Sequence, residues 1–240
     1  MRFLLNNDST LELRGAPQFL PLKGGLIVSC QVPDDTAINT PAFIAAQAET
    51  VVQAGAAGVR AQGVANVAAV SKVTDLPIVG LVKRYLDSCP VYITPLVSDV
   101  VELANAGATI VAIDATGRPR PDGQSLKEFI EAVRAVSTVP LLADVDSVES
   151  ARIAEELGCE AIATTLSGYT DIAITGLPNI DLIAEISKVV KLPVIAEGGF
   201  NQIEDVARAF RAGAWSVCIG TAITNPYLLT KYFLTALDQA

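Results

Sequence analysis

The sequence has no histidine, and its 240 residues include four cysteines, one tryptophan and one methionine. Without an imidazole, Ser-His-Asp and Cys-His catalysis are excluded, and zinc sites are excluded because histidine and paired cysteines are their usual ligands. The cysteines lie far apart and form no C-x-x-C pair, which predicts reduced core residues in a cytoplasmic protein. Lysine and carboxylate side chains are therefore the groups left for proton transfer.

Long apolar runs and an excess of positive charge are also missing. No apolar run reaches the ~18 residues that a membrane span needs, and residues 1–5 are too short an apolar run for a signal peptide. The formal net charge is −9 and the pI is near 4.5, so neither nucleic acid nor a membrane is expected as a partner. An anionic metabolite would need a site built from local dipoles or a few cations.

Aliphatic side chains are abundant and follow a recurring pattern. Hydrophobic residues make up 51% of the chain and aromatic residues 5%, a balance typical of parallel strands covered by helices. Short aliphatic runs, each of which predicts a strand, occur at 26–30, 57–60, 78–82, 109–113, 141–144, 161–165, 194–196 and 216–219. Ala-rich stretches with helical spacing lie between them at 40–54, 97–106, 148–157 and 203–212. A glycine follows each of these stretches and predicts the end of a helix.

Eight strands alternating with helices predict an α/β fold, a single (β/α)₈ barrel of the TIM type. An open, doubly wound sheet is the alternative, and the lack of a G-x-G-x-x-G motif after the first run counts against it. Residues 1–22 fall outside the pattern and are expected to form an N-terminal extension, packed on the barrel or partly disordered. Residues 23–240 are expected to form the barrel domain, with no second domain.

Polar residues stand at the ends of the predicted strands. In such a barrel, the C-terminal strand ends and the loops after them form the active site. In order, the residues at these ends are Gln31, Arg60, Lys83, Asp114, Asp144, Thr165, Glu197 and Gly220. Because ions in a confined cavity lose hydration, a barrel selected only for stability has no reason to gather them at one mouth. The set therefore favours a functional site, although any one member could belong to a structural ion pair.

Glycines follow the last two predicted strands, at Gly198, Gly199 and Gly220, with Thr221 next to the last of them. The loops after strands seven and eight of a barrel commonly hold phosphate through backbone N–H groups. Glycine lets the backbone approach an anion closely. The pair of loops therefore predicts a phosphate site, the alternative being that these glycines serve tight turns alone.

Lys83 and Glu197 are the leading candidates for proton transfer. A lysine at a strand end can act as a neutral general base or as a Schiff-base nucleophile. Either role needs a lowered pKa, which partial burial and a neighbouring cation such as Arg60 or Arg84 could supply. Glu197 could be the partner acid or base, or it could bind a substrate hydroxyl.

At several of these segments the sequence resembles the N-acetylmannosamine-6-phosphate 2-epimerase family. The resemblance runs from about residue 24 to the end, and its motifs are GLIVSCQ at 25–31, VKR at 82–84, TTLSGYT at 164–170 and IAEG at 195–198. It implies a cytoplasmic TIM-barrel isomerase of amino-sugar and sialic-acid catabolism. Such an enzyme converts N-acetylmannosamine 6-phosphate to N-acetylglucosamine 6-phosphate without an added cofactor or metal.

Carried over motif by motif, the resemblance implies that Lys83 is the catalytic acid/base and that Glu197 is its carboxylate partner. The implied or candidate substrate contacts are Gln31, Arg60, Asp144, Thr165 and Asn225, and the implied phosphate contacts are Gly198, Gly199, Gly220 and Thr221. Asn225 is a departure, because the family usually has an arginine there, whose charge and reach asparagine cannot replace. Either other donors hold the anion, which is favoured, or the affinity or the acyl sugar differs.

The residues suit this chemistry. In the open-chain sugar the C2 proton is acidified by the neighbouring aldehyde, so neutral Lys83 could remove it while Arg60 or Gln31 stabilises the enolate. Reprotonation on the opposite face needs Glu197 or Asp144 as a second acid, or one base that acts twice.

Three alternatives stay open at this point. They are a Schiff-base lyase or aldolase, a non-catalytic sugar-phosphate binder, and a metal-assisted isomerase using Asp114, Asp144 and Glu197. A second copy of the chain, in a homodimer, is the one protein partner considered.

Overall fold

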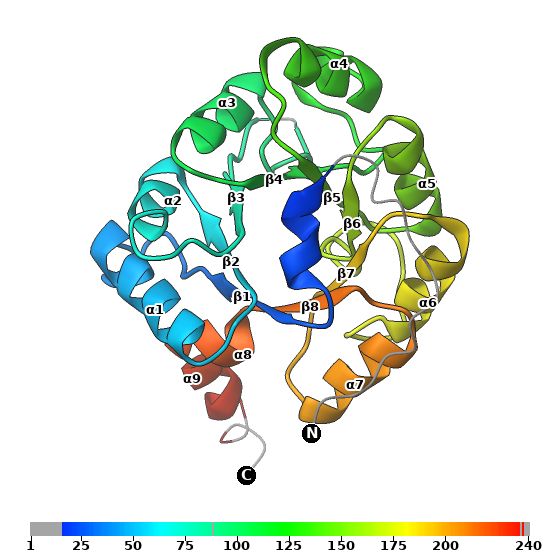
Figure 1. The fold of residues 1–240 in the computed structure, drawn as a ribbon. Helices are drawn as coiled ribbons and strands as arrows, with labels where there is room; N and C mark the ends of the chain where they lie inside the picture. Colours follow the sequence, from blue (N-terminus) through cyan, green and yellow to red (C-terminus); the bar gives the residue numbers. More distant parts are fainter. Residues whose placement is uncertain (1–15, 88, 236, 238–240) are drawn as a thin grey trace.

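The computed structural model describes residues 16–87, 89–235 and 237, and eight parallel strands close into a barrel within that part of the chain (Figure 1). The strands are Leu26–Cys30 (β1), Gly58–Gln62 (β2), Ile78–Leu81 (β3), Ile110–Asp114 (β4), Leu141–Asp144 (β5), Ala161–Ala163 (β6), Val194–Glu197 (β7) and Ser216–Ile219 (β8). Each strand pairs with the next, and β8 pairs with β1. The predicted (β/α)₈ barrel is confirmed, and the open sheet is wrong because the sheet has no edge.

The helices form a ring around the barrel (Figure 1). They are Pro41–Gln53 (α1), Val64–Val70 (α2), Val97–Asn105 (α3), Leu126–Val136 (α4), Val148–Glu156 (α5), Ile180–Val189 (α6), Ile203–Arg211 (α7), Thr221–Thr224 (α8) and Pro226–Leu234 (α9), with short 3₁₀ helices at Pro17–Leu22 (η1) and Pro121–Gly123 (η2). The four helices predicted from the sequence each end one residue before the predicted end. After α3, Gly107 has φ of +102°, a conformation that favours glycine.

Five strand ends differ from those predicted: β4 and β7 each continue one residue further, to Asp114 and Glu197, and the other three differences move candidate site residues. β2 continues to Gln62, so Arg60 lies inside the strand, where its side chain points into the barrel while Val59 and Ala61 pack against the helices. β3 and β6 end earlier, which places Lys83 and Thr165 in the loops that follow them. Beyond β3 the chain bends to form an antiparallel bridge between Lys83 and Ile93. The bridge anchors the loop and the lysine above the end of the strand.

The barrel end at which the strands begin is closed by η1, which crosses it in Figure 1. Phe19 and Leu22 of η1 are fully buried and join the apolar cluster inside the barrel. The Trp215 indole donates a hydrogen bond to the Phe19 carbonyl, at 2.9 Å. Residues 1–15 of the predicted extension lie outside the described residues, so the division into residues 1–22 and 23–240 stays a prediction. Among the described helices, none is long and apolar enough to cross a membrane.

Candidate active site

A cavity of about 920 Å³ opens at the other end of the barrel, where the strands finish. We call it the mouth cavity. Of the eight residues predicted to line the mouth, six do so: Gln31, Arg60, Lys83, Thr165, Glu197 and Gly220. The predicted phosphate-loop residues and Asn225 line it as well. Its volume is in the range of small-molecule sites, about 300–1,000 Å³.

Asp114 and Asp144 do not line the cavity, contrary to the prediction, because both are fully buried beneath it. Asp114 accepts hydrogen bonds from the Thr116 hydroxyl and from Arg118, within its own loop. Asp144 accepts two hydrogen bonds from Arg60, which lies between it and the cavity. A charged residue at the end of a strand can thus be paired with a neighbouring side chain inside the barrel and not be available to a ligand at the mouth.

Arg60 is the centre of an ionic group formed from β2, β5 and β7. One of its terminal nitrogens lies 2.6 Å from Asp144 Oδ2, and the other lies 3.0 Å from Asp144 Oδ1 and 2.9 Å from Glu197 Oε2. The guanidinium is 2% exposed and its Nε has no partner among the described residues. Two carboxylates therefore share one buried cation, and each of its terminal nitrogens donates to at least one of them.

Thr165 completes this group, which we call the Arg60 cluster: Arg60, Asp144, Thr165 and Glu197. The Thr165 hydroxyl lies 2.7 Å from Asp144 Oδ1 and 3.0 Å from Glu197 Oε2. A hydroxyl has one proton to donate, so it can satisfy only one of two ionised carboxylates at a time. A proton on Glu197 would relieve that competition.

Glu197 is the member of the cluster that reaches the cavity, with 14% of its side chain exposed. Burial raises the pKa of the Glu197 carboxyl above its usual value; the Arg60 charge opposes this rise and the Asp144 charge adds to it. Its backbone is held by Thr164, whose hydroxyl accepts from the Glu197 N–H at 3.0 Å. The protonated form of Glu197 is therefore favoured more than that of an exposed glutamate.

Lys83 faces the same cavity and forms no ion pair with any described residue. Burial lowers the pKa of the Lys83 ammonium, and the Arg60 charge lowers it further, while Glu197 and Asp34 act in the opposite direction. Desolvation thus shifts Lys83 towards the neutral amine and Glu197 towards the neutral acid. Lys83 is thereby made available as a base, and Glu197 is made available as a proton donor.

Lys83 and Glu197 also approach the cavity from opposite sides. Lys83 follows β3 and Glu197 ends β7, and these strands are four positions apart in either direction around the closed barrel. A molecule bound between the two side chains presents one face to the amine and the other to the carboxyl.

The loops after β7 and β8 offer backbone donors beside Glu197. The N–H groups of Gly199, Gly220 and Thr221 donate to no acceptor in the described part of the chain. Gly199 has φ of +73°, and a Cβ on it would lie 2.3 Å from Leu177 Cβ, so this position requires glycine. Among the described residues that line the cavity, Arg60 and Lys83 alone carry positive charge. An anion held by these loops therefore depends on neutral N–H groups.

Asn225 has a structural role in addition to lining the cavity. Its Oδ1 accepts a hydrogen bond from the Leu228 N–H at 3.0 Å and caps α9, whose first residue is Pro226. Asparagine followed by proline is a common helix start. The cap explains why an asparagine suits this position, whatever it contributes to a ligand.

The structure adds residues that sequence reasoning missed. Tyr85 and Tyr92 line the cavity and stack with ring centroids 5.5 Å apart, and the Arg118 guanidinium lies 5.9 Å from the Tyr92 ring. Asp34 and four residues of α9, Leu228, Leu229, Tyr232 and Phe233, also line it. The tyrosines lie in the loop after β3, which has no periodic pattern, so only the position of Lys83 nearby could have pointed to them.

No group of three or more potential metal ligands occurs within residues 16–87, 89–235 and 237. Asp114 is paired with Arg118, while Asp144 and Glu197 are paired with Arg60. The three carboxylates considered for a metal-assisted isomerase are thus divided between two arginines rather than gathered around a common point.

Comparisons with known proteins agree on one family. The family described as "Putative N-acetylmannosamine-6-phosphate epimerase" matches residues 44–239. Two relatives are described as "Putative N-acetylmannosamine-6-phosphate 2-epimerase". The one from Clostridioides difficile is 38% identical, and the match covers 90% of this chain and 97% of the relative. The one from Thermosynechococcus vestitus is 40% identical, and the match covers 90% of this chain and 94% of the relative.

Solved structures lead to the same family. The N-acetylmannosamine-6-phosphate 2-epimerase from Clostridium perfringens superposes with a TM-score of 0.85 and 35% identity, covering 98% of this chain and all of that one. A thiamine phosphate pyrophosphorylase from Pyrococcus furiosus, with a TM-score of 0.59 and 17% identity over 85% of this chain and 89% of its own, shares the fold alone.

Proposed function

This chain belongs to the N-acetylmannosamine-6-phosphate epimerase family, and from that premise we propose that it interconverts N-acetylmannosamine 6-phosphate and N-acetylglucosamine 6-phosphate in amino-sugar and sialic-acid catabolism. The two sugars differ only in configuration at C2. A proton must therefore leave C2 from one face and return to the other. The observation that carries the proposal is the placement of Lys83 and Glu197 after β3 and on β7, opposite each other across one cavity.

The opposed pair favours a two-base reaction. In one direction the neutral amine of Lys83 removes the C2 proton of the open-chain sugar, and the protonated Glu197 carboxyl delivers a proton to the other face. In the reverse direction the roles exchange, so Glu197 removes the proton and the Lys83 ammonium returns one. Asp144 is less suited to be the second acid, because it is fully buried and bonded to Arg60 and Thr165. The raised pKa of Glu197 and the lowered pKa of Lys83 support this assignment.

Gln31 is the better candidate for stabilising the enolate oxygen. One terminal nitrogen of Arg60 donates to both Asp144 and Glu197, the other donates to Asp144, and the side chain is 2% exposed, so it presents little donor surface to the cavity. The Gln31 amide lines the cavity and uses one of its two hydrogens on the Ser29 hydroxyl, at 2.9 Å. Arg60 then acts through Glu197, by holding the carboxyl in place and balancing its charge.

The 6-phosphate is assigned to the loops after β7 and β8. The free N–H groups of Gly199, Gly220 and Thr221 are donors of the kind that bind phosphate in barrels. Asn225 lies at the same side of the cavity. Because the described residues of these loops include no arginine or lysine at the cavity, the phosphate accepts hydrogen bonds from neutral N–H groups and forms little ion pairing there.

We place the reaction in a reducing compartment, the cytoplasm. Cys30, Cys159 and Cys218 are free and buried, as is usual in proteins kept reduced. The Schiff-base lyase and the non-catalytic binder are not favoured, since the named relatives are epimerases.

The test is proton NMR of each epimer separately with the enzyme in D₂O. The wild-type enzyme should place deuterium at C2 and form the other epimer, and a complete absence of exchange and epimer would refute the function. Glu197→Gln should exchange the C2 hydrogen of one epimer without converting it, and Lys83→Ala should show the reciprocal pattern. If one variant loses exchange from both epimers while the other keeps both, a single base acts and the two-base reaction is wrong. Glu131→Gln, on the exposed face of α4, is the control and should behave as wild type.

A further inference from the structure

Cys218 faces the inside of the barrel, unlike the other buried cysteines of the described chain. Cys30 and Cys159 pack among the apolar side chains between the strands and the helices. Cys218 belongs to the apolar cluster in the barrel interior, is 2% exposed, and lines the mouth cavity. A free cysteine packs much like a small aliphatic side chain, so burial alone does not explain a thiol in the wall of the proposed active site.

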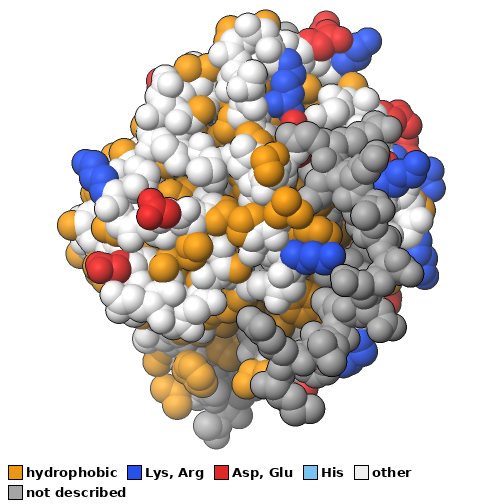
Figure 2. All heavy atoms as spheres, in the orientation of Figure 1, with side chains coloured by type: hydrophobic (Ala, Val, Ile, Leu, Met, Phe, Trp, Pro, Cys, Tyr) orange, Lys and Arg blue, Asp and Glu red, His pale blue; other side chains and the backbone are white. Residues whose placement is uncertain are grey.

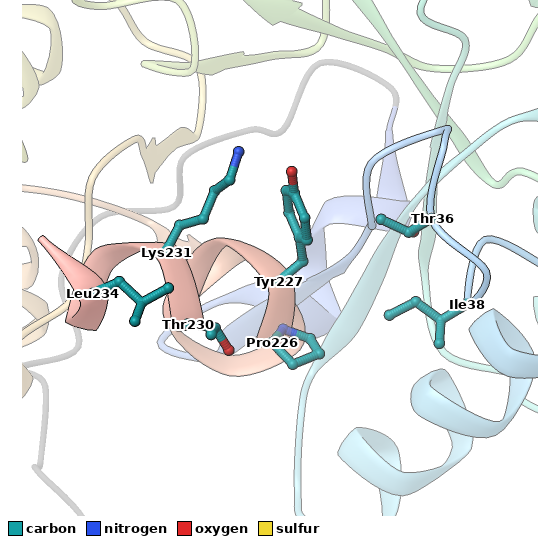
Figure 3. Close-up of a pocket in the computed structure, with 7 residues that line it drawn as sticks. All are labelled: Thr36, Ile38, Pro226, Tyr227, Thr230, Lys231 and Leu234. Atoms are coloured by element: carbon teal, nitrogen blue, oxygen red, sulfur yellow. The ribbon is translucent and has the colours of Figure 1, made fainter.

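The mouth cavity is the place where this thiol meets a carboxylate. At the closed end of the barrel, Phe19 and Leu22 fill the interior, and Figure 2 shows hydrophobic side chains gathered around the barrel axis at that end. The outer groove of about 510 Å³ between α9 and the loop after β1 (Figure 3) is lined, among the described residues, by no cysteine and no carboxylate. In the mouth cavity, by contrast, Cys218 and Glu197 belong to the same lining.

Cys218 and Glu197 are directly paired in register on β8 and β7. Paired residues of neighbouring strands point to the same side of a sheet, and the residues before them, Val217 and Ala196, pack on the helix side. Both side chains therefore point into the barrel. The Cys218 thiol lies within hydrogen-bonding reach of the Glu197 carboxyl.

The thiol is the donor in this contact. Burial and the Glu197 charge raise the pKa of the Cys218 thiol well above its usual value, so the sulfur keeps its proton. Arg60 and Thr165 both donate to Glu197 Oε2, from β2 and from the loop after β6. Cys218 approaches the same carboxyl from β8. The carboxyl is thus held from three parts of the barrel, and its orientation depends on all three.

A weak donor suits a carboxyl that must change its charge during the reaction. A thiol binds a neutral carboxyl feebly, and its hydrogen bond strengthens when the acceptor becomes ionised. The contact therefore stabilises the carboxylate that forms when Glu197 gives up its proton, more than it stabilises the acid before transfer. An interaction that grows in this way lowers the barrier to transfer.

From these observations we propose that Cys218 is a positioning residue, whose thiol donates a hydrogen bond to the Glu197 carboxylate and orients it towards the substrate. Cys218 acts through Glu197 and exchanges no proton with the sugar. Its effect on catalysis rests on the proposed epimerase function, whereas the hydrogen bond does not. The two can therefore fail separately.

The kinetic experiment compares Cys218→Ala with Cys218→Ser, because these side chains are similar in size and only serine can donate. The thiol hydrogen bond lowers the pKa of Glu197, so its loss in Cys218→Ala should move the acid limb of the pH–rate profile to higher pH, by about half a unit. We expect kcat to fall about 3- to 10-fold with little change in KM. In Cys218→Ser the hydroxyl restores a donor, so its acid limb should lie below that of Cys218→Ala.

The matched control is Cys159→Ala, which removes a buried thiol from the outer core. It should lose stability as Cys218→Ala does, but keep the wild-type acid limb. An acid limb of Cys218→Ala at the wild-type position would overturn the positioning role, because a packing defect alone does not move it.

Infrared spectroscopy tests the hydrogen bond without any measurement of activity. The S–H stretching band of Cys218, isolated as the difference between wild type and Cys218→Ala, should shift as the pH crosses the titration of Glu197. In a Glu197→Gln background the band should stay constant with pH. A wild-type band that does not move would overturn the proposal. A band that moves in an enzyme with no epimerase activity would confirm the hydrogen bond and refute the proposed function instead.

Discussion

Two buried arginine–carboxylate clusters lie side by side in this barrel, and only one of them opens onto the cavity. The Arg118 cluster consists of Asp114, Thr116 and Arg118, and the Arg60 cluster was defined above. Asp114 and Asp144 are directly paired in register on β4 and β5, and both are fully buried. Asp114 finds its partners within four residues, whereas Asp144 binds an arginine from the other side of the barrel.

The difference between the clusters is one of charge balance. In the Arg118 cluster a single carboxylate meets an arginine, a hydroxyl and a backbone N–H. In the Arg60 cluster two carboxylates share one arginine and one hydroxyl. Burial raises the pKa of a carboxyl in both clusters, that of Asp114 in the first and that of Glu197 in the second, but only Glu197 lies beside the cavity. Excess acid at the mouth, rather than charge at a strand end, distinguishes the reactive site.

The largest effect on kcat should come from removing the second carboxylate of the Arg60 cluster, that of Glu197. In Glu197→Gln the amide can still bond to Thr165 and Arg60 keeps Asp144, so the fold should be retained. We expect kcat to fall about 10²- to 10⁴-fold, the usual contribution of a general acid or base. Steady-state kinetics with a denaturant titration tests this, and a kcat within tenfold of wild type would contradict the assignment.

Asp144→Asn should disturb both stability and chemistry. It breaks a buried pair, and the loss of one partner of such a pair costs about 3–5 kcal/mol of unfolding free energy. Because the Asp144 charge raises the pKa of Glu197, its removal should also move the acid limb of the pH–rate profile to lower pH. Chemical denaturation and a pH profile of the variant measure the two effects. An unmoved acid limb would show that Glu197 does not set it.

Asp114→Asn is the matched change in the other cluster and should separate stability from activity. Arg118 is 18% exposed, so water can replace part of its lost partner. We expect a loss of about 1–3 kcal/mol with kcat unchanged. A fall in kcat comparable to that of Asp144→Asn would mean that the two clusters are not distinct.

The smallest expected effect is a shift in the pH values at which the acid and alkaline limbs of the pH–rate profile lie. The proposed reaction needs one proton shared between Lys83 and Glu197, so activity should fall when both are protonated and when both are deprotonated. Since the pKa of Glu197 is raised from 4.5 and that of Lys83 lowered from 10.5, the acid limb of kcat/KM should lie above pH 4.5 and the alkaline limb below pH 10.5. A profile with limbs outside this interval would contradict both shifts.

The fold could be predicted from the sequence because its signals are local. Aliphatic runs, helical spacing and terminal glycines occur within a few residues of the elements that they define. Most residues that line the mouth could be predicted, because the C-terminal ends of all the strands lie at the same end of a parallel barrel. The contacts inside it were not, because Arg60 meets Asp144 and Glu197 across 84 and 137 residues. Asn225 was missed for a different reason. The Asn-Pro pair at 225–226 is a local signal for the start of a helix, but Asn225 was considered only as the replacement of an arginine that binds the substrate.

The closed end of the barrel gives the protein a built-in optical probe. The chain has one tryptophan, and its ring lies against η1, with its indole bonded to Phe19 and the Lys23 ammonium 4.8 Å from its centre. Its emission should therefore report on the release of η1 from the barrel, while ligands entering at the opposite end leave it nearly constant. The opening of the closed end can therefore be followed in an unlabelled sample without interference from ligand binding.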